Sequence, residues 1–476
     1  MKEKIESFQL RGLCAAAGSV DITDCADTTY SGFVRAESVV RDPVQMRMIR
    51  FTSANGDALW MNMDETNLPI HPTYGFLDRL SKKIDIPVSR IMLCQTHCHS
   101  GLSCYRIDWD RLLDLTAHGV AGLKGKERPV AFVSERIGLL PEGSIVNRRV
   151  AIGEGLGDTC VVFNTHCTVD MEHRALDAGG WVLNELKSIG ACAPDAAVPA
   201  GKFMLNRPVD RRLHLWVLKD ADKNPLAAVL RANAHPVMVS QKWVKNVISG
   251  DYPAVAMHRI SSALGAPCLF INGAFGDTRP LQSEYSFAER DRFGALCAET
   301  VLAAPEQNVP TAELNGAFLE TWIPVRADVG ASPEEARRLQ KECQTQGPAT
   351  PQEKKKRKER LDVLKLTVED LEKHGESAFL TATDLSTGRM PARFHAWRLG
   401  PMKLVTLPGE PFVKVASDLE RATGALAVGV TDASSGYLPD VESFPRGGYE
   451  PTWCAFDERG LALVPEIAGR VAEQLK

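Results

Sequence analysis

The chain lacks the features that mark membrane, exported or polyanion-binding proteins. Its 476 residues contain no apolar run long enough to cross a bilayer, and no apolar leader segment follows the charged start at residues 1–6. The net charge of −4 is small, so neither nucleic acid nor an anionic lipid surface is an expected partner. Twelve cysteines spread over this length predict free thiols instead of a disulfide framework. These absences favour a cytoplasmic protein without stable membrane insertion.

Hydrophobic residues are abundant, at 44%, and they fall in segments that alternate between strand and helix patterns. Turn signals separate the strand-like residues 46–52 from 58–64, and residues 213–219 from 227–233. The pattern predicts an α/β fold in which mixed β-sheets are covered by helices. Helices are expected at residues 73–84, 108–120, 253–264, 290–302 and 410–421, and further strands at 91–96, 268–272, 402–407 and 426–430.

Residues 332–374 form a segment of different character, which predicts an inserted helical hairpin. Ser332 and Glu335 frame a capping box, and a Gly-Pro break at 347–348 separates two helices. The second helix carries a basic run, interpreted as a solvated face, and an apolar stripe that needs a surface to bury against. The hairpin is expected to cover a site mouth or to join a partner subunit, within a single catalytic domain of residues 1–476. The stripe consists of Leu361, Leu364, Val368 and Leu371.

Two histidines two residues apart give the first sign of chemistry. The sequence Gln-Thr-His-Cys-His-Ser-Gly at 95–101 follows an apolar run, so His97 and His99 are expected on one side of a strand at its carboxyl end. Converging imidazoles at a strand end commonly hold a transition metal, usually zinc. Two separately hydrogen-bonded histidines remain the alternative. Three nearby cysteines match no standard zinc spacing and are expected to pack as thiols: Cys94, Cys98 and Cys104.

Four further turns carry residues of metal-binding or catalytic type. A His-Pro pair at 235–236 ends a strand-like run, and Ser-Gly-Asp at 249–251 opens a helix. The glycine-rich loop at 272–280 follows a strand-like run. Loops of this kind bring backbone N–H groups or a short side chain close to a ligand. Pro-Gly-Glu at 408–410 places a carboxylate after a strand and at the start of a helix, where it also complements the helix dipole. Each signal is weak when taken alone.

Together and in this order, these segments resemble the neutral/alkaline non-lysosomal ceramidase family. The likeness rests on the Thr-His-x-His-Ser-Gly segment at 96–101, the His-Pro and Ser-Gly-Asp turns, the Gly-Asp loop and Pro-Gly-Glu. An early Val-Asp-Ile-Thr at 20–23, Gly-Tyr-Leu-Pro at 436–439 and Gly-Tyr-Glu at 448–450 extend it over the whole chain. The resemblance implies the fold of the ceramidase catalytic domain.

The resemblance also implies one zinc ion and an amide-cleaving site. Zinc with an open coordination position lowers the pKa of bound water to about 7, which would let that water attack an amide carbonyl. His99 would lie behind the metal or contact substrate, and Tyr449 would polarise the carbonyl. An arginine in an Asn-Arg motif would contact substrate, either Arg148 or the competing Arg207. By motif match, the zinc ligands would be His97, His235, Glu410 and Tyr437.

The chain departs from the family in the glycine-rich loop. The family reads Gly-Asp-x-Ser-Pro, whereas residues 276–280 read Gly-Asp-Thr-Arg-Pro. Arg279 therefore replaces a serine, and its guanidinium suits a substrate carboxylate. Together with Asp277 and Thr278, it is expected to bind substrate. The structural alternative is an internal ion pair of Arg279 with Asp277 or Asp251.

The family also has a carboxy-terminal immunoglobulin-like domain, whereas this chain ends soon after the last motif. With no leader segment either, a membrane sphingolipid is the less favoured substrate. The sequence thus predicts a cytoplasmic, ceramidase-like zinc amidohydrolase acting on a small acyl amide, with an anionic substrate favoured. The alternatives are a ceramidase acting on N-acyl-sphingosine, a lactonase or esterase, and a metal- or ligand-binding homologue without catalysis. A homo-oligomer is an open expectation.

Overall fold

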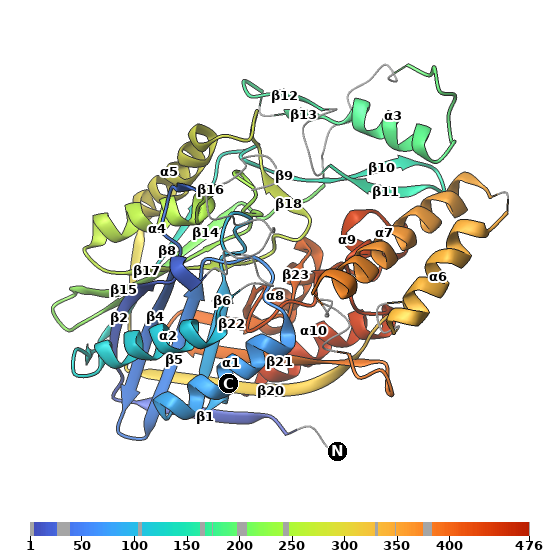
Figure 1. The fold of residues 1–476 in the computed structure, drawn as a ribbon. Coiled ribbons are helices and arrows are strands. Elements are labelled where there is room, and N and C mark those ends of the chain that lie inside the picture. The colour runs from blue at the N-terminus through green and yellow to red at the C-terminus, as the bar shows by residue number, and fades with distance from the viewer. Residues whose placement is uncertain are drawn as a thin grey trace.

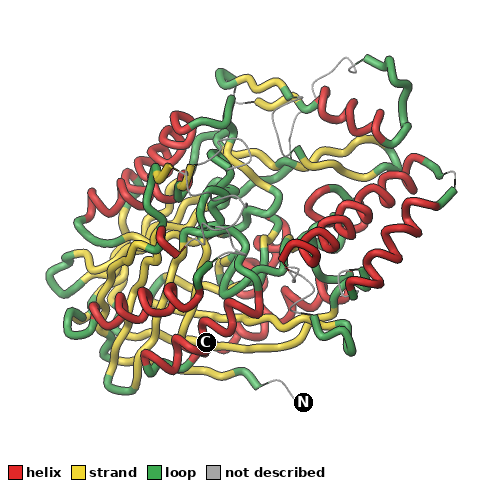
Figure 2. The backbone as a smooth tube through the Cα atoms, viewed as in Figure 1, coloured by secondary structure: helices red, strands yellow, loops and turns green. Residues whose placement is uncertain are grey.

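Most of the strands in the described part of the chain form three five-stranded sheets, with helices on the outer face of each. Figure 1 shows this arrangement along the chain, and Figure 2 shows the strands gathered in the body of the molecule with helices around them. It confirms the predicted α/β fold of mixed sheets covered by helices. The computed structural model describes residues 4–25, 39–102, 107–161, 167–173, 175–197, 207–240, 247–328, 332–347, 349–374 and 383–475.

The first sheet is built from the amino-terminal part of the chain. In spatial order its strands are β6 (Ile91–Gln95), β5 (Gly56–Met63), β4 (Gln45–Ser53), β2 (Cys14–Asp21) and β7 (Arg128–Pro129). Only β5 and β6 run parallel, and the others pair antiparallel. Apolar side chains on helices α1 (Ile70–Ile84) and α2 (Trp109–Leu123) pack against its outer face.

The second sheet comes from the middle of the chain. In spatial order its strands are β17 (Cys268–Asn272), β15 (Pro225–Ala232), β14 (Arg212–Lys219), β8 (Phe132–Leu139) and β19 (Glu306–Pro310). The expected hairpin is the pair β14–β15, and β15 and β17 run parallel. Helices α4 (Asp251–Leu264) and α5 (Phe287–Ala303) cover the outer face.

The third sheet joins the amino-terminal strand to the last third of the chain. In spatial order its strands are β1 (Glu6–Arg11), β20 (Glu313–Pro324), β21 (Arg389–Leu399), β22 (Met402–Thr406) and β24 (Leu426–Val428). Strands β22 and β24 run parallel. Helices α8 (Val413–Thr423) and α10 (Glu458–Ala472) pack on the outer face.

The inner faces of the three sheets share one hydrophobic core. Trp60 of β5, Trp216 of β14 and Trp397 of β21 each contribute a fully buried ring to it. The rings of Trp60 and Trp397 meet edge to face, with centroids 6.0 Å apart. Strand alternation explains the two-sided burial, because the neighbouring Leu59 and Met61 face helices α1 and α2 instead.

Each sheet contains one parallel pair of strands, and the carboxyl ends of these pairs meet. At the end of β17, the Asn272 amide donates to the carbonyls of Gln95 (2.9 Å) and Thr96 (3.0 Å) after β6. The amide of Gly429, just beyond β24, donates to the Asn272 carbonyl at 2.9 Å, and that of Gln95 donates to the Val430 carbonyl at 3.2 Å. One loop from each sheet is therefore fixed at a single place.

The predicted insert is a helical hairpin, as expected. Helices α6 (Pro333–Thr345) and α7 (Pro351–His374) pack against each other, so three residues of the apolar stripe, Leu361, Leu364 and Val368, pack on the first helix. The side chain of Leu371 lies outside the described part of the structure. Ser332 caps α6 by accepting a hydrogen bond from the amide of Glu335. The packed residues include Ala336, Cys343, Leu361, Leu364 and Val368.

Short elements complete the described structure. The two-stranded pairs are β3 (Val39–Val40) with β16 (Val247–Ile248), β9 (Ile145–Asn147) with β18 (Thr278–Pro280), β10 (Arg149–Gly153) with β11 (Gly157–Cys160), β12 (Thr168–Asp170) with β13 (Ala175–Asp177), and β23 (Glu410–Pro411) with β25 (Tyr437–Leu438). The remaining helices are α3 (Gly179–Ser188) and α9 (Tyr449–Thr452), with 3₁₀ turns at Thr23–Cys25, Val88–Arg90, Phe444–Arg446 and Glu473–Leu475.

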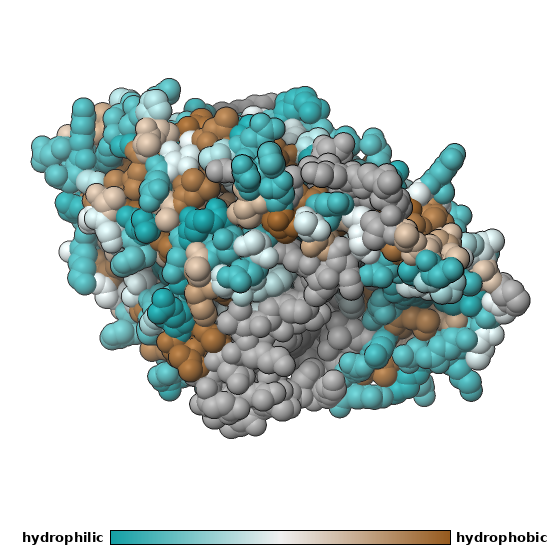
Figure 3. Space-filling model, turned by 90° about the horizontal axis from the view of Figure 1, so that it is seen from above, coloured by the Kyte–Doolittle hydropathy of each residue, from teal (hydrophilic) through white to brown (hydrophobic). Residues whose placement is uncertain are grey.

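Two observations bear on contact with a membrane. Within the described ranges, every helix is too short or too polar to cross a membrane. Seen from above, hydrophobic side chains are interspersed with hydrophilic ones over the described part of that face (Figure 3).

One helix begins later than the sequence predicts. Glu410 was expected to open a helix, but it lies in β23, and α8 begins at Val413. The reason is that the backbone amides of Glu410 and Phe412 donate to the carbonyls of Gly436 (2.9 Å) and Leu438 (3.1 Å). The tertiary pairing with β25 thus overrides the local helix pattern.

The shared core predicts a large cost for removing one of its rings. Trp397→Ala is expected to lower the free energy of unfolding by about 3–5 kcal/mol, because the ring contacts Phe51 and Trp60 and nothing refills the space. Trp322→Ala on β20 is the matched control, since that ring is 43% exposed. Denaturant midpoints measure both variants. Equal shifts for the two would contradict a core shared by the three sheets.

Candidate metal centre

Histidine and carboxylate side chains converge at the junction of the three sheets. His97 and His99 follow β6, His235 follows β15, and Glu410 follows β22. His97 and His99 share the loop after one parallel pair of strands, and His235 and Glu410 each follow a strand of another parallel pair. All except His99 are at most 1% exposed. The fold therefore brings together residues that lie more than 300 positions apart in the chain.

The two neighbouring histidines converge for a reason other than the predicted one. They were expected on one side of a continuing strand, but β6 ends at Gln95. His97 has a φ of 62°, in the left-handed region that side chains other than glycine rarely adopt. Its amide donates to the Glu65 carbonyl at 2.8 Å, which holds the backbone in this turn. The turn brings the His97 and His99 rings to a centroid distance of 5.0 Å.

The donor atoms lie at separations that one metal ion can bridge. The Nε2 atoms of His99 and His235 are 3.1 Å apart, and Glu410 Oε2 is 3.5 Å from His97 Nε2. Glu410 Oε2 also lies 3.7 Å from the other nitrogen of the His235 ring, Nδ1. Ligand atoms bound tetrahedrally to zinc lie roughly 3.3 Å from one another. Ligand nitrogens of all three histidines fall within 4.8 Å. The geometry therefore fits a metal, and it brings His99 as close as the predicted ligands.

Burial keeps the imidazoles neutral, as a metal needs, but it disfavours the ionised form of Glu410. It lowers the pKa of His97 and His235 well below the usual value and lowers that of His99 to about 4, so the imidazoles are neutral at pH 7. Burial also raises the pKa of Glu410 to about 8, although nearby Arg148 acts to lower it. A bound cation would favour the carboxylate form.

Unsatisfied polar atoms are concentrated in the same group. Both ring nitrogens of His97 and Oε2 of Glu410 are buried without a hydrogen-bond partner among the described residues. Buried polar atoms are normally paired, so such atoms call for a ligand. His235 Nδ1 lies 3.4 Å from the Phe275 carbonyl, and a metal-binding histidine commonly donates its other ring N–H to such an oxygen. The residues present therefore fit a zinc ion.

Tyr437, the fourth predicted ligand, lies beside this group and is held by Arg148. Arg148 Nη2 donates to the Tyr437 hydroxyl at 3.1 Å and to the Gly276 carbonyl at 2.7 Å, while its Nε donates to Glu450 Oε1 at 3.0 Å. Burial and Glu410 raise the pKa of Tyr437 well above its usual value, and Arg148 acts to lower it. The guanidinium thus favours the ionised tyrosine that a metal ligand requires.

Arg148 belongs to a buried network of ion pairs. Glu450 also accepts from Arg149 Nη1 at 2.7 Å, and Asp158 accepts from Arg149 at 3.1 Å and from Arg207 at 2.9 Å. Burial acts to raise the pKa of Glu450, but Arg149 and Arg148 outweigh it, and the pKa is lowered. Of the two arginines predicted to contact substrate, the structure brings Arg148 to the metal group and leaves Arg207 on Asp158. The motif partner of Arg207, residue 206, lies outside the described residues.

Two of the predicted substrate-binding residues make contacts within the protein. Asp277 Oδ2 accepts from Asn147 Nδ2 at 2.7 Å, and its Oδ1 accepts from the Val413 amide at 3.0 Å. Thr278 Oγ1 donates to the Asn233 carbonyl at 2.7 Å. Neither Asp277 nor Thr278 is among the described residues that line the cavity below. Their contact with substrate stays a prediction.

Arg279 does line that cavity. Its guanidinium carbon lies 5.8 Å from the centre of the Tyr285 ring, and the side chain is 2% exposed. The two acids named as alternative partners accept hydrogen bonds of their own, Asp277 as described and Asp251 from the amides of Val239 (3.1 Å) and Tyr252 (2.6 Å). The contact of Arg279 with substrate stays a prediction.

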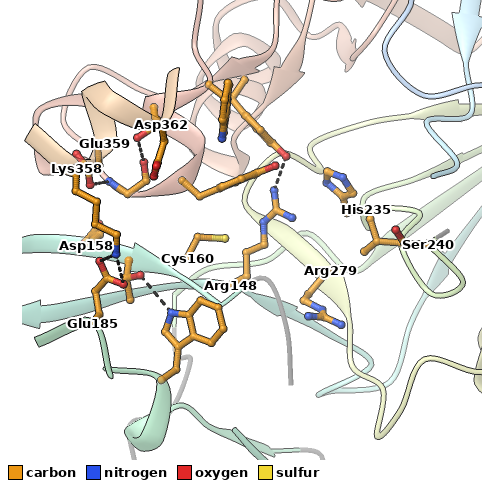
Figure 4. A pocket seen from close by; sticks show the side chains of 18 of the residues that line it. Arg148, Asp158, Cys160, Glu185, His235, Ser240, Arg279, Lys358, Glu359 and Asp362 are labelled. Carbon is orange, nitrogen blue, oxygen red and sulfur yellow. Dashed lines mark hydrogen bonds and ion pairs between the residues drawn. The ribbon is translucent and has the colours of Figure 1, made fainter. Parts of the chain in front are cut away.

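A cavity of about 330 Å³ opens beside the metal group. In Figure 4, His235, Ser240 and Arg279 lie on one side of it, Arg148 and Cys160 lie in the middle, and Glu185, Lys358 and Asp362 lie on the other. Tyr449 also lines the cavity, with its ring centroid 5.8 Å from that of Tyr437. The remaining described lining residues are His99, Asp158, Thr159, Trp181, Val237, Tyr285, Lys355, Glu359, Tyr437, Gly448, Thr452 and Trp453.

The sequence did not reveal the wall that α3 and α7 contribute. The basic run of α7 was interpreted as a solvated face. Lys354, Lys356 and Lys358 are exposed, but Lys355 is buried and Lys358 also lines the cavity. Lys355 pairs at 2.6 Å with Glu359 one helical turn away, a spacing that solvated helices show as well. The predicted packing role is met by Cys94 and Cys98, which are both buried, and Cys104 lies outside the described residues.

Two glycines allow the loops around the metal group to approach closely. A side chain at Gly276 would place its Cβ 2.4 Å from the Glu410 carbonyl oxygen, and one at Gly409 would meet the Gly436 carbonyl oxygen at 2.3 Å. Any larger residue would have to displace the backbone of a predicted ligand. This explains why both motifs contain glycine beside their acid.

Comparison with known proteins bears on the fold. The sequence matches no protein-family model and no curated protein. The structure resembles neutral ceramidase from Pseudomonas aeruginosa, with a TM-score of 0.64 and 14% identity, over 98% of this chain and 74% of that one. A ceramidase complexed with C2 aligns with a TM-score of 0.63 and 13% identity, over 98% and 75% of the two chains. The resemblance predicted from the sequence motifs is thus confirmed for the fold, which is that of the ceramidases.

Proposed function

We propose that the chain is a zinc-dependent hydrolase that cleaves the C–N amide bond of a small acyl amide, with an anionic substrate preferred. The observation that carries this proposal is the group of three neutral imidazoles and Glu410 beside a compact cavity. The ceramidase fold supports amide hydrolysis over other reactions. Because that likeness concerns the fold, the reaction itself needs the tests below.

Four side chains are the predicted metal ligands. His97, His235, Glu410 and Tyr437 would bind zinc, which supplies an activated water and polarises a carbonyl when bound. Arg148 would hold the Tyr437 oxygen in place at 3.1 Å. This assignment leaves His99 beside the metal, in contact with the cavity.

The cavity residues would bind and orient the amide. Partial burial raises the pKa of Tyr449, whose side chain opens to the cavity, so its hydroxyl stays protonated and can donate to a carbonyl oxygen as negative charge develops there. Arg279, on the opposite loop, would bind a carboxylate of the substrate through its two-pronged guanidinium. At about 330 Å³, the cavity is at the small end of the range for ligand sites. A ceramidase acting on N-acyl-sphingosine, which the fold alone favours, is the second candidate.

Removing one predicted ligand tests the metal. His235→Ala is expected to reduce zinc from one ion per chain to nearly none, and to abolish hydrolysis, because two of the nearest donor contacts are lost. Zinc is measured by mass spectrometry after dialysis. His214→Ala is the matched control, since that histidine is also buried but contacts Glu135 away from the group.

The same measurement distinguishes the two ligand sets. His99→Ala keeps its zinc if Tyr437 is the fourth ligand, and loses it if His99 is. Full zinc occupancy in His235→Ala would contradict both sets.

The raised pKa of Glu410 predicts how the metal-free protein responds to pH. In the folded protein Glu410 keeps its proton up to a pKa of about 8. In the unfolded chain the same carboxyl has already released its proton above pH 5. The chelator-treated protein should therefore lose about 2 kcal/mol of stability between pH 6.5 and 8.5. Glu410→Gln removes this loss, and zinc should also remove it. Chemical denaturation at each pH measures the effect, and parallel curves for wild type and Glu410→Gln would refute it.

Substitution of Arg279 tests the substrate class. Arg279→Lys keeps the charge but loses the fork, so it should raise KM mainly for carboxylate-bearing amides. Arg279→Ser restores the family residue and should shift preference towards neutral amides. Steady-state kinetics on paired neutral and anionic acyl amides measure both effects. An unchanged ranking of substrates in both variants would assign Arg279 a structural role.

A further inference from the structure

The far end of the cavity is built by α3 and α7, two elements that lie apart in the sequence. Lys358 Nζ of α7 donates to Glu185 Oε1 at 3.0 Å and to Ser188 Oγ at 3.3 Å, both on α3. Lys358 and Glu185 both line the cavity, and Figure 4 shows them on the side away from His235. This ion pair therefore bridges the inserted hairpin and the body of the protein across the end of the site.

We propose that Lys358, held by Glu185, determines substrate specificity by closing the cavity with a short, charged end wall. The wall admits amides whose remote end is short or polar and rejects those with a long apolar tail. This inference rests on the proposed amide hydrolysis, whose active end lies at the metal group. It also gives the inserted hairpin a role within the site.

The wall is fixed in position because α7 is anchored to the loop that precedes Tyr449. Lys355 is 4% exposed and donates to Glu359 at 2.6 Å and to the Arg446 carbonyl at 3.3 Å. Glu359 in turn accepts from the Gly448 amide at 2.7 Å. Tyr449, which follows directly, lines the cavity. The distance from the reacting end to the end wall is thus set by the hairpin.

The chemistry of the end wall opposes an alkyl tail. Glu185, Lys358 and Asp362 present charged groups to the cavity, and Trp181, also on α3, lines it as well. An alkyl chain placed against these groups would remove their water without replacing its hydrogen bonds. A polar or ionic group would replace them.

The ion pair can be altered without threatening the fold. The side chains of Lys358 and Glu185 remain 44% and 19% exposed, and pairs of this kind contribute little to stability. The hairpin is held instead by its own apolar packing and by Lys355 and Glu359. Substitution of Lys358 therefore tests specificity and not folding.

Hydrolysis of two substrate series tests the inference. In one, the acyl side of a small amide is lengthened from two to eight carbons, and in the other the amine side is lengthened. Wild type should lose kcat/KM with length in the series whose tail meets α7. Lys358→Ala should raise kcat/KM for the eight-carbon member of that series about tenfold relative to the two-carbon member.

Two further variants separate length from polarity. Lys358→Met keeps the side chain's length without its charge, so it should raise kcat/KM for apolar tails less than Lys358→Ala does, and Glu185→Gln should have a partial effect. Lys365→Ala is the matched control on the same helix, because that side chain is 68% exposed and lies off the cavity. Length profiles of Lys358→Ala that coincide with wild type in both series overturn the inference.

A binding measurement separates this inference from the proposed function. Calorimetry gives the affinity of zinc-loaded wild type and Lys358→Ala for linear carboxylates of two to eight carbons. A gain in affinity for the longer acids in Lys358→Ala supports the wall even if neither protein hydrolyses any amide, which would overturn the proposed function alone. Hydrolysis with unchanged length profiles and affinities overturns the wall and leaves the function standing.

Discussion

The side-chain amide of Asn272 and the strand ends that it joins hold together one loop from each of the three sheets, beside the metal group. The direction in which the backbone leaves a strand is set by the sheet that contains the strand. The packing of three sheets therefore does not by itself align three loops. Asn272 accomplishes this by donating to the carbonyls of Gln95 and Thr96, while its own carbonyl accepts from Gly429. These bonds are buried, where an unpaired partner is costly. The arrangement of the loops is therefore tightly determined.

The cost of this arrangement appears in the backbone beside the site. His97, Val430 and Asp432 have φ values of 62°, 46° and 60°, which side chains other than glycine rarely adopt. For the β-branched Val430 the conformation is particularly unfavourable. Residues in such conformations persist only where their surroundings over-determine them, and they cluster at functional sites. Here the backbone amide of Asp432 donates to the Leu93 carbonyl, and its carboxylate lies 2.9 Å from Nε2 of His395. The two contacts fix the turn from both sides.

Electrostatics add a second constraint, because the site buries both neutral donors and full charges. The imidazoles are neutral through desolvation, whereas Arg148 and Arg149 stay charged because Glu450 bridges them at 3.0 and 2.7 Å. A buried guanidinium without an acid would be strongly destabilising. Glu450 therefore allows Arg148 to stand beside Tyr437. This acid directly follows Tyr449 in the chain, so one short helix, α9, supplies both a cavity residue and the support of the Tyr437 oxygen.

Much of the fold followed from local patterns, and the site followed from the order of its motifs. Strand alternation and turn signals placed the hairpins β4–β5 and β14–β15, and the motif order pointed to His97, His235 and Glu410, which the structure brings together. The turn at His97 could not be predicted, because a positive φ at histidine is imposed by tertiary hydrogen bonds. The same applies to Glu410, whose strand pairing involves residues 27 positions away.

The position of Arg148 was decided by contacts that no spacing in the sequence records. Both Asn-Arg pairs carry the same local pattern, so local sequence cannot rank Arg148 above Arg207. The ranking comes from acids distant in the chain. Glu450 lies 302 positions from Arg148 and directs it towards Tyr437, whereas Asp158 binds Arg207 at 2.9 Å.

The hairpin shows most clearly where local sequence information ends. Its two helices and their mutual packing follow from a capping box and an apolar stripe, both of which are local. Its docking depends on the other face of α7, where a run of lysines looks the same whether it meets solvent or acids. Glu359 and Glu185, which lie on α7 and α3, supply the partners for Lys355 and Lys358. The sequence does not show which acid a given lysine pairs with. A charged helix face can therefore be identified as a cavity wall only when the position of its partner is known.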